Sequence, residues 1–401
     1  MESSLYFHIP FCLRRCGYCD FNTYAGMESH IPAYVKAICC EVENVLSQVH
    51  DSLKVTTIFF GGGTPSLVTP DQYRSIFQTI QQHATLSPDA EITLEANPET
   101  VTLESILAYK EAGFTRVSLG MQSASPFDLK VLDRRHKNES LLAALHACRK
   151  AGFDHINLDL IFGIPGQSLE SWKRTLELAL TLSVDHFSIY SLILEEGTRL
   201  KFWSDRGIIS EPDDDLAADM YEYAMAYLEN NGYSQYEISN WAKHPSARSQ
   251  HNLQYWRYLP YLGFGAGAHG FWGNMRMVNT PAIPAYLNQL KLMTTPGFPA
   301  SPAANEITRL SKWEMMQENL MVALRMTDEG LSFQAFRNRY GVDVHDVFAC
   351  QIRRLTYEGL LEESNGERLR LTRKGRLFGN RVFAAFIANK VPVGYEYLDD
   401  Q

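Results

Sequence analysis

The chain is short of basic charge and of long apolar runs. Its formal net charge is −9 over 401 residues, and no block of lysine and arginine rises above the background, so the electrostatic footprint of a nucleic-acid-binding protein is missing. No stretch approaches the roughly 18 uninterrupted apolar residues that span a bilayer, and the first residues lack the basic and apolar segments of a secretory signal. We expect a cytoplasmic protein that does not bind nucleic acid.

Cysteine is also scarce. The chain has seven cysteines, and an odd number scattered in this way does not suit the disulfide framework of a secreted protein. Buried free cysteine packs like a small apolar side chain, so the cysteines that stand apart in helix-like sequence are expected to be core residues. These are Cys39, Cys40, Cys148 and Cys350.

The remaining cysteines, Cys12, Cys16 and Cys19, lie close together in the segment CLRRCGYC. Three thiolates on one loop can bind a 4Fe–4S cluster and leave its fourth iron open to an outside molecule. The alternative is a structural zinc ion with His8 as the fourth ligand. Structural zinc sites commonly pair two such cysteine knuckles, and the sequence has no second one, which favours the cluster.

Short β-rich runs alternate with amphipathic segments of helical length up to about residue 195, a pattern typical of βαβ units and a parallel sheet. Helices are expected at 34–46, 72–82 and 141–151. Six strand–helix units cannot close the eight-stranded barrel, so an α/β fold with a doubly wound sheet or an open, partial barrel is predicted. The expected strands are 5–9, 56–60, 91–96, 116–122, 156–162 and 186–193.

Composition divides the chain into three expected parts. Residues 1–200 form the barrel core, and residues 201–305, rich in glycine, proline and aromatics, form an extension. Residues 306–401 contain three helical segments, then LRLTRKGR as a β-wing, then a last helix over 373–388, which predicts a smaller helical and winged-helix-like domain. Its basic patch is short, so DNA binding is not favoured.

Polar and glycine-rich segments follow the expected strands, at the ends where parallel α/β folds place their ligands. GGGTP (61–65) follows the second strand, Glu95 ends the third, Gln122 ends the fourth and Asp159 lies in the fifth. We expect one mouth of the fold to collect them beside the cysteines. Structural hydrogen bonds for Gln122 and Asp159, and a surface ion pair for Arg134, remain the alternatives.

The spacing CxxxCxxC after the first strand, with GGGTP after the second, resembles the radical S-adenosylmethionine superfamily. The resemblance implies that the three clustered cysteines bind a 4Fe–4S cluster. The open iron of this cluster would chelate S-adenosylmethionine, and an electron from the cluster would cleave S-adenosylmethionine to a 5'-deoxyadenosyl radical. It implies cofactor contacts at Tyr6, Tyr18, Gly62 and Glu95. The oxidase of this family also holds a second S-adenosylmethionine, at positions that correspond to Gly63, Thr64, Gln122, Arg134 and Asp159.

More narrowly, motifs spread over nearly the whole chain resemble the oxygen-independent coproporphyrinogen III oxidase-like proteins, and among these the heme chaperone branch. Two departures from the oxidase favour the chaperone branch. Phe21 stands where the oxidase has a further cysteine, and the sequence before Cys12 has no room for the extension that covers the oxidase's substrate. Oxidative decarboxylation of coproporphyrinogen III remains the alternative activity, so whether the chain is an enzyme stays open.

The segment HNLQYW (251–256) matches a motif, HNxxYW, of the heme chaperone branch and predicts an imidazole beside two aromatics on a loop. Imidazole can ligate heme iron, so His251 is a candidate heme ligand, with a hydrogen-bonded scaffold histidine as the alternative. The branch implies that the chain binds heme and delivers it to heme-dependent respiratory proteins at the membrane's inner face. A heme donor protein, peripheral membrane contact and a monomer or dimer are further expectations.

Overall fold

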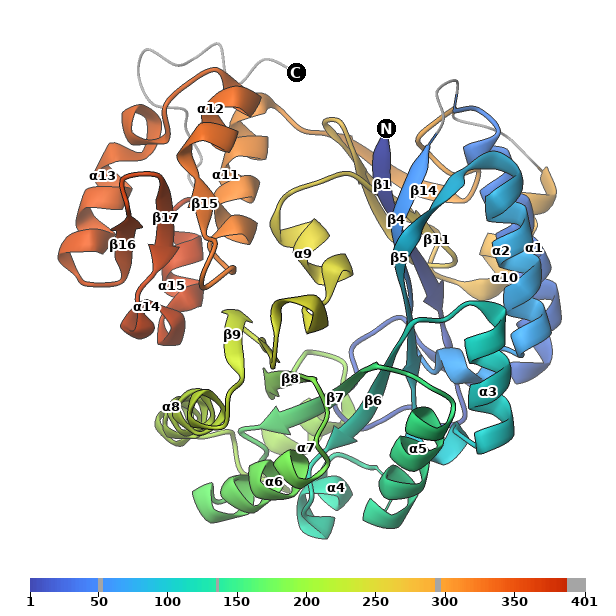
Figure 1. The fold of residues 1–401 in the computed structure, drawn as a ribbon, viewed down its shortest axis with the longest axis horizontal. Coiled ribbons are helices and arrows are strands. Elements are labelled where there is room, and N and C mark those ends of the chain that lie inside the picture. The colour runs from blue at the N-terminus through green and yellow to red at the C-terminus, as the bar shows by residue number, and fades with distance from the viewer. Residues whose placement is uncertain (50–52, 135–136, 293–296, 388–401) are drawn as a thin grey trace.

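The computed structural model describes residues 1–401 except 50–52, 135–136, 293–296 and 388–401. In this part of the chain a 12-stranded sheet curves through the molecule, and helices cover its outer face (Figure 1). The strand order is β14-β13-β12-β11-β1-β4-β5-β6-β7-β8-β10-β9. The two edge strands of the described sheet do not pair with each other, so the barrel is open, as the sequence predicts.

Six parallel strands form the centre of the sheet and confirm the strands expected from the sequence. Each pairs with the next along the chain, so their carboxyl ends meet at one edge. They are β1 (Glu2–Ile9), β4 (Lys54–Gly62), β5 (Thr85–Ala96), β6 (Arg116–Gln122), β7 (His155–Phe162) and β8 (His186–Ser191).

The sheet is extended on both sides of this parallel core. Strand β11 (Tyr261–Phe264) runs parallel to β1, a pairing that its glycine-rich sequence did not predict. The other added strands are antiparallel to their neighbours. They are β9 (Ser234–Glu237), β10 (Asn240–Ala242), β12 (His269–Trp272), β13 (Met275–Asn279) and β14 (Ala304–Arg309).

The central strands alternate between an apolar outer face and a more polar inner face, because successive side chains point to opposite sides of a sheet. In β4, Ile58 and Phe60 are fully buried on the outer face, where the Phe60 ring packs against Tyr73 at 4.7 Å between centroids. Thr57 and Phe59 face inward and contact His251. Site chemistry therefore lies on the inner face and at the carboxyl edge.

Helices cover the outer face (Figure 1). Thr69 and Thr102 form capping boxes at the starts of α2 and α3, and Gly113 and Gly152, with φ of 120° and 78°, follow the ends of α3 and α5. The helices are α1 (Ile31–Leu46), α2 (Pro70–His83), α3 (Leu103–Ala112), α4 (Pro126–Val131), α5 (Asn138–Lys150), α6 (Leu169–Thr181), α7 (Arg199–Asp205), α8 (Asp214–Asn230) and α10 (Ile283–Leu292).

Helix α9 (Gln250–Trp256) differs from these because it lies on the inner side of the sheet, between the sheet and the C-terminal unit (Figure 1). Its Leu253 belongs to the core of that unit, as does Tyr236 of β9. The extension and the C-terminal unit therefore share a core, while the division into three domains stays a prediction. Among the described residues, every helix is too short or too polar to cross a membrane.

The C-terminal unit contains the expected three helices and a small antiparallel wing. One expectation is wrong: in place of a single helix over 373–388, residues 373–377 and 379–384 form two short helices, since Phe378 between them leaves the helical conformation with φ −104° and ψ 24°. Residue 388 is outside the described part. The elements are α11 (Lys312–Ala323), β15 (Leu331–Ser332), α12 (Phe333–Tyr340), α13 (Val344–Tyr357), β16 (Leu361–Ser364), β17 (Arg368–Leu371), α14 (Arg373–Leu377) and α15 (Gly379–Ala384).

Candidate cluster and cofactor site

The cysteine loop (residues 12–19) follows β1 at the carboxyl edge of the sheet, and its three cysteines are free thiols. Burial, together with the charges of neighbouring thiolates, raises the pKa of Cys12 to about 11, and burial and the charge of Cys19 also raise the pKa of Cys16. Three thiols on one loop are the donor set of an iron–sulfur cluster. The positive irons of a cluster would offset the free-energy cost of ionising these thiols. No three described histidine, cysteine or acidic side chains converge closely enough for a single metal ion. A cubane offers each thiolate a separate iron.

Gly17 allows the cysteine loop to pass close to α7. The amide of Leu200 donates to the carbonyl of Gly17 at 2.9 Å, and a Cβ on Gly17 would lie 2.6 Å from Leu200 Cδ1. A larger residue at position 17 would require the end of the Leu200 side chain to shift.

Asp133 is a site residue that the sequence analysis missed. Its Oδ1 accepts from Arg14 Nη2 at 2.6 Å, and its Oδ2 accepts from Arg199 Nη1 at 2.7 Å. One carboxylate thus joins the cysteine loop to the start of α7. The contacts connect residues 119 and 66 positions apart, and no local pattern signals them.

The glycine loop (residues 61–65) lies against the cysteine loop. The amides of Gly63 and Thr64 donate to the carbonyls of Ile9 and Phe11 at 2.8 and 2.7 Å, and Thr64 Oγ1 lies 3.6 Å from Cys12 Sγ. A Cβ on Gly63 would meet the Phe11 carbonyl oxygen at 2.6 Å. Glycine is therefore required for the two loops to come this close.

Glu95 lies beside the glycine loop on the inner face of β5. Burial and the charge of Asp159 raise its pKa to about 8, and the Gly62 amide opposes this by donating to Oε2 at 3.2 Å. Within the described residues no cation pairs with this carboxylate. A half-buried carboxyl group without a cation suits an incoming ammonium or hydroxyl group.

Tyr6 and His8 support the cysteine loop from β1. The Tyr6 hydroxyl lies 2.9 Å from His8 Nδ1, and His8 Nε2 lies 2.9 Å from the carbonyl of Asn22. Both ring nitrogens of His8 are therefore engaged within the protein, which does not favour the zinc alternative.

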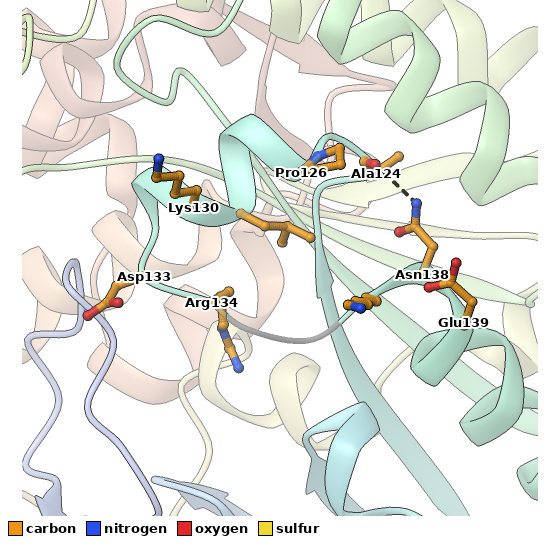
Figure 2. A pocket seen from close by; sticks show the side chains of 9 residues that line it. Ala124, Pro126, Lys130, Asp133, Arg134, Asn138 and Glu139 are labelled. Atoms are coloured by element: carbon orange, nitrogen blue, oxygen red, sulfur yellow. Dashed lines mark hydrogen bonds between the residues drawn. The ribbon is translucent and has the colours of Figure 1, made fainter.

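Arg134 connects the cysteine loop to the end of β5. Its Nη1 donates to Asn97 Oδ1 at 2.6 Å and its Nη2 donates to the Tyr18 hydroxyl at 3.2 Å, so its partners are neutral groups and not those of a surface ion pair. Its Nε is buried without a partner among the described residues. Arg134 also borders a pocket of about 470 Å³ beside α4 and α5, in which Figure 2 shows its side chain turning away from Asn138 and Glu139.

Gln122 is the last residue of β6, and Asp159 lies within β7. Gln122 has φ 64°, a strained conformation for a non-glycine residue, at an irregularity in the pairing of β6 with β7. Asp159 accepts from Ser118 Oγ at 2.9 Å and from Asn157 Nδ2 at 2.8 Å, and burial raises its pKa. Asp159 thus makes hydrogen bonds within the sheet, which the sequence analysis gave as the alternative to a ligand contact. A role of Asp159 in binding a ligand stays a prediction.

His251 lies in helix α9, so the expectation that it lies on a loop is wrong. The residue is 1% exposed, its Nδ1 lies 2.7 Å from Thr57 Oγ1, and its Nε2 lies 2.8 Å from the Tyr255 hydroxyl. Burial lowers its pKa to about 3, so the ring is neutral. Ligation of heme iron by His251 would require one of these hydrogen bonds to break.

Glu91, which the sequence analysis also missed, explains why this segment is helical. Its Oε1 accepts from the amide of His251 at 2.9 Å and its Oε2 accepts from the amide of Gln250 at 3.1 Å, while Ser249 caps the helix by accepting from the amide of Asn252. A carboxylate at a helix N-terminus satisfies free amides and the positive end of the helix dipole. Glu91 lies 160 positions before His251, so no local pattern signals this cap.

Comparison with known proteins identifies the family. A model of the Radical SAM superfamily matches residues 6–179, and one of the HemN C-terminal domain matches residues 310–378. The chain is 36% identical to the heme chaperone HemW of Bacillus subtilis over 96% of this chain and 99% of that one, and 34% identical to HemW of Lactococcus lactis over 97% and 98%. The chain belongs to the HemW family. Coproporphyrinogen III oxidase (HemN) from Escherichia coli, with 22% identity, shares the fold at a TM-score of 0.80 over 96% of this chain and 89% of that one.

Proposed function

We propose that this HemW-family chain is a cytoplasmic heme chaperone, which binds heme and delivers it to heme-dependent respiratory proteins. The observation that carries the proposal is its similarity, over nearly the full length of both chains, to proteins named heme chaperone. In the proposal the cysteine loop holds a 4Fe–4S cluster with S-adenosylmethionine, and these cofactors regulate transfer or oligomeric state. The geometry supports the cofactor part, because free thiols, the glycine loop and Glu95 share one edge of the sheet.

The residues around the cysteines have distinct proposed roles. When bound, the cluster supplies an electron to the sulfonium of S-adenosylmethionine. Glu95 accepts the cofactor's ammonium or ribose hydroxyl, and the backbone of Gly62 lies against it. Tyr6 contacts His8 through its hydroxyl, and Tyr18 accepts a hydrogen bond from Arg134. These contacts hold the cysteine loop in position. The partnerless Nε of Arg134 offers a donor for a second polar ligand.

Anaerobic decarboxylation of coproporphyrinogen III is the second candidate, since the fold is shared with the E. coli oxidase. The side chain of Phe21, which is 62% exposed, stands where the oxidase has a further cysteine. This departure favours the chaperone.

One preparation tests both candidates. Protein reconstituted anaerobically with iron and sulfide is titrated with heme, then mixed with an apo-cytochrome, and a parallel sample receives coproporphyrinogen III, reductant and S-adenosylmethionine. We expect heme binding, transfer to the apo-cytochrome and no protoporphyrinogen. Absence of heme binding, or accumulation of protoporphyrinogen, would overturn the chaperone proposal.

A further inference from the structure

A second pocket lies away from the cysteine loop, between the segment after α9 and the C-terminal unit. Its volume is about 330 Å³, and it shares no lining residue with the cysteine or glycine loops. Its walls combine apolar side chains with three arginines. The lining residues are Arg257, Leu259, Asn319, Ala323, Met326, Glu329, Gly330, Leu331, Ser332, Ala335, Phe336, Arg339 and Arg368.

The charges of this pocket are unbalanced, which is unusual in a chain with a net charge of −9. Glu329 is the one carboxylate among the lining residues, and its two oxygens accept from Arg257 at 2.7 and 3.1 Å. Arg339 donates to the carbonyl of Tyr258 at 2.8 Å, and Arg368 donates to the carbonyl of Glu329 at 3.0 Å. Carbonyl partners carry no formal charge, so the pocket keeps a positive excess that attracts anions.

The pocket near Arg134 has a smaller positive excess. Its lining includes the cations Lys130, Arg134 and Lys137 but also the anions Asp133 and Glu139. The pocket beside the C-terminal unit is therefore the better candidate for a negatively charged ligand.

The apolar walls of the arginine pocket indicate what else the ligand contains. Leu259 and Ala335 present accessible apolar surface to the pocket, and the nearly buried side chains of Met326, Leu331 and Phe336 complete its apolar lining. An apolar surface beside guanidinium groups suits a molecule with an apolar body and carboxylates, because arginine pairs with carboxylates in a planar, two-bonded geometry. A porphyrin with its two propionates has both features.

We propose that this pocket receives the propionate edge of the heme that the chain carries, with Arg339 and Arg368 holding the carboxylates. The inference rests on the proposed function, since it takes heme as the cargo. Most of the macrocycle stays outside the pocket, whose volume admits only one edge of it. The C-terminal unit thereby binds the cargo, while the cysteine loop binds the cofactors.

The test compares the Arg339→Gln, Arg368→Gln double variant of the full chain with Arg353→Gln. Arg353 is an exposed arginine of α13 outside the pocket, whose side chain donates to the carbonyl of Ala349, so it is a matched control. We expect the double variant to bind hemin at least tenfold more weakly than wild type and the control to bind it equally well. Equal affinity for hemin in the double variant and wild type would overturn the pocket assignment and leave the chaperone function standing.

Ligand variants test the same point without changing the protein. Hemin dimethyl ester, which lacks the two carboxylate charges, should bind wild type about as weakly as hemin binds the double variant. Dodecanoate serves as an apolar carboxylate without a macrocycle. Tight binding of the ester, or displacement of hemin by an equal concentration of dodecanoate, would overturn the assignment to porphyrin propionates. If wild type binds no hemin at all, the proposed function itself fails.

Discussion

Glu91 and Glu95 lie on the same inner face of β5, yet their surroundings are opposite. The carboxylate of Glu91 accepts from three donors at the start of α9 and lies 3.8 Å from Arg116. Glu95 accepts from the amide of Gly62 alone among its described partners, and burial raises its pKa to about 8. The fold gives the carboxylate at one end of the inner face several donors and leaves the carboxyl group at the other end with one.

We call the first region the plugged end, formed by Thr57, Glu91, Arg116 and helix α9. We call the second the open end, formed by the cysteine loop, the glycine loop and Glu95. Buried polar groups with full sets of partners specify structure, whereas a buried group without them is costly and is retained where a ligand supplies the partner. The comparison predicts that variants at the open end change ligand binding, while variants at the plugged end change stability.

Replacement of all three clustered cysteines by alanine should have the largest effect on ligand binding. The Cys12→Ala, Cys16→Ala, Cys19→Ala variant should lose essentially all bound iron and acid-labile sulfide after anaerobic reconstitution, because no thiolate remains for the cluster. Cys350→Ala, at an exposed position, is the control and should retain iron. Full iron content in the triple variant would show that the open end is not a cluster site.

Replacement of Glu91 should have the largest effect on stability. Glu91→Ala leaves Arg116, whose side chain is 3% exposed, without its carboxylate, and loss of one partner of a buried pair costs about 3–5 kcal/mol. The free energy of unfolding in urea measures this loss. Glu95→Ala, on the same strand and face, is the matched control and should not lower the free energy of unfolding by more than about 1 kcal/mol, since no described cation loses a partner. Equal losses in the two variants would remove the distinction between the ends.

His251→Ala should have a smaller effect. Loss of the hydrogen bonds from the buried ring to Thr57 and Tyr255 should lower the free energy of unfolding by about 1–3 kcal/mol. Because both ring nitrogens are engaged, we expect the Soret band of the hemin complex to stay at its wild-type position. A shifted Soret band would instead identify His251 as a heme ligand and make α9 part of the heme site.

The sequence predicted features that depend on neighbouring residues. The alternation of short β-rich runs with amphipathic segments of helical length located all six central strands, and the cysteine spacing located the loop after β1. Contacts between distant parts of the chain were not predictable in this way. The helical state of HNLQYW depends on Glu91, and the anchoring of the cysteine loop depends on Asp133. Each of these carboxylates stands in ordinary polar sequence and acquires its role only when the sheet folds.

The pH dependence of stability provides the finest test of the comparison. The pKa of Glu95 rises from an ordinary value of 4.5 to about 8 in the folded chain. Between these values the unfolded chain releases a proton that the folded chain retains, so the free energy of unfolding falls as pH rises, by at most about 1.4 kcal/mol per pH unit. Below the unfolded pKa the contribution is fully present, and above pH 8 it is lost.

Glu95→Gln removes this titration, so the variant should lack the part of the slope between pH 5 and 8 that wild type shows in urea unfolding. Glu91→Gln should retain the slope, because it leaves Glu95 in place. Parallel curves for wild type and Glu95→Gln would mean that Glu95 is ionised in the folded chain. The open end would then hold a full negative charge at neutral pH, and an incoming ammonium would be met by a carboxylate that needs no deprotonation.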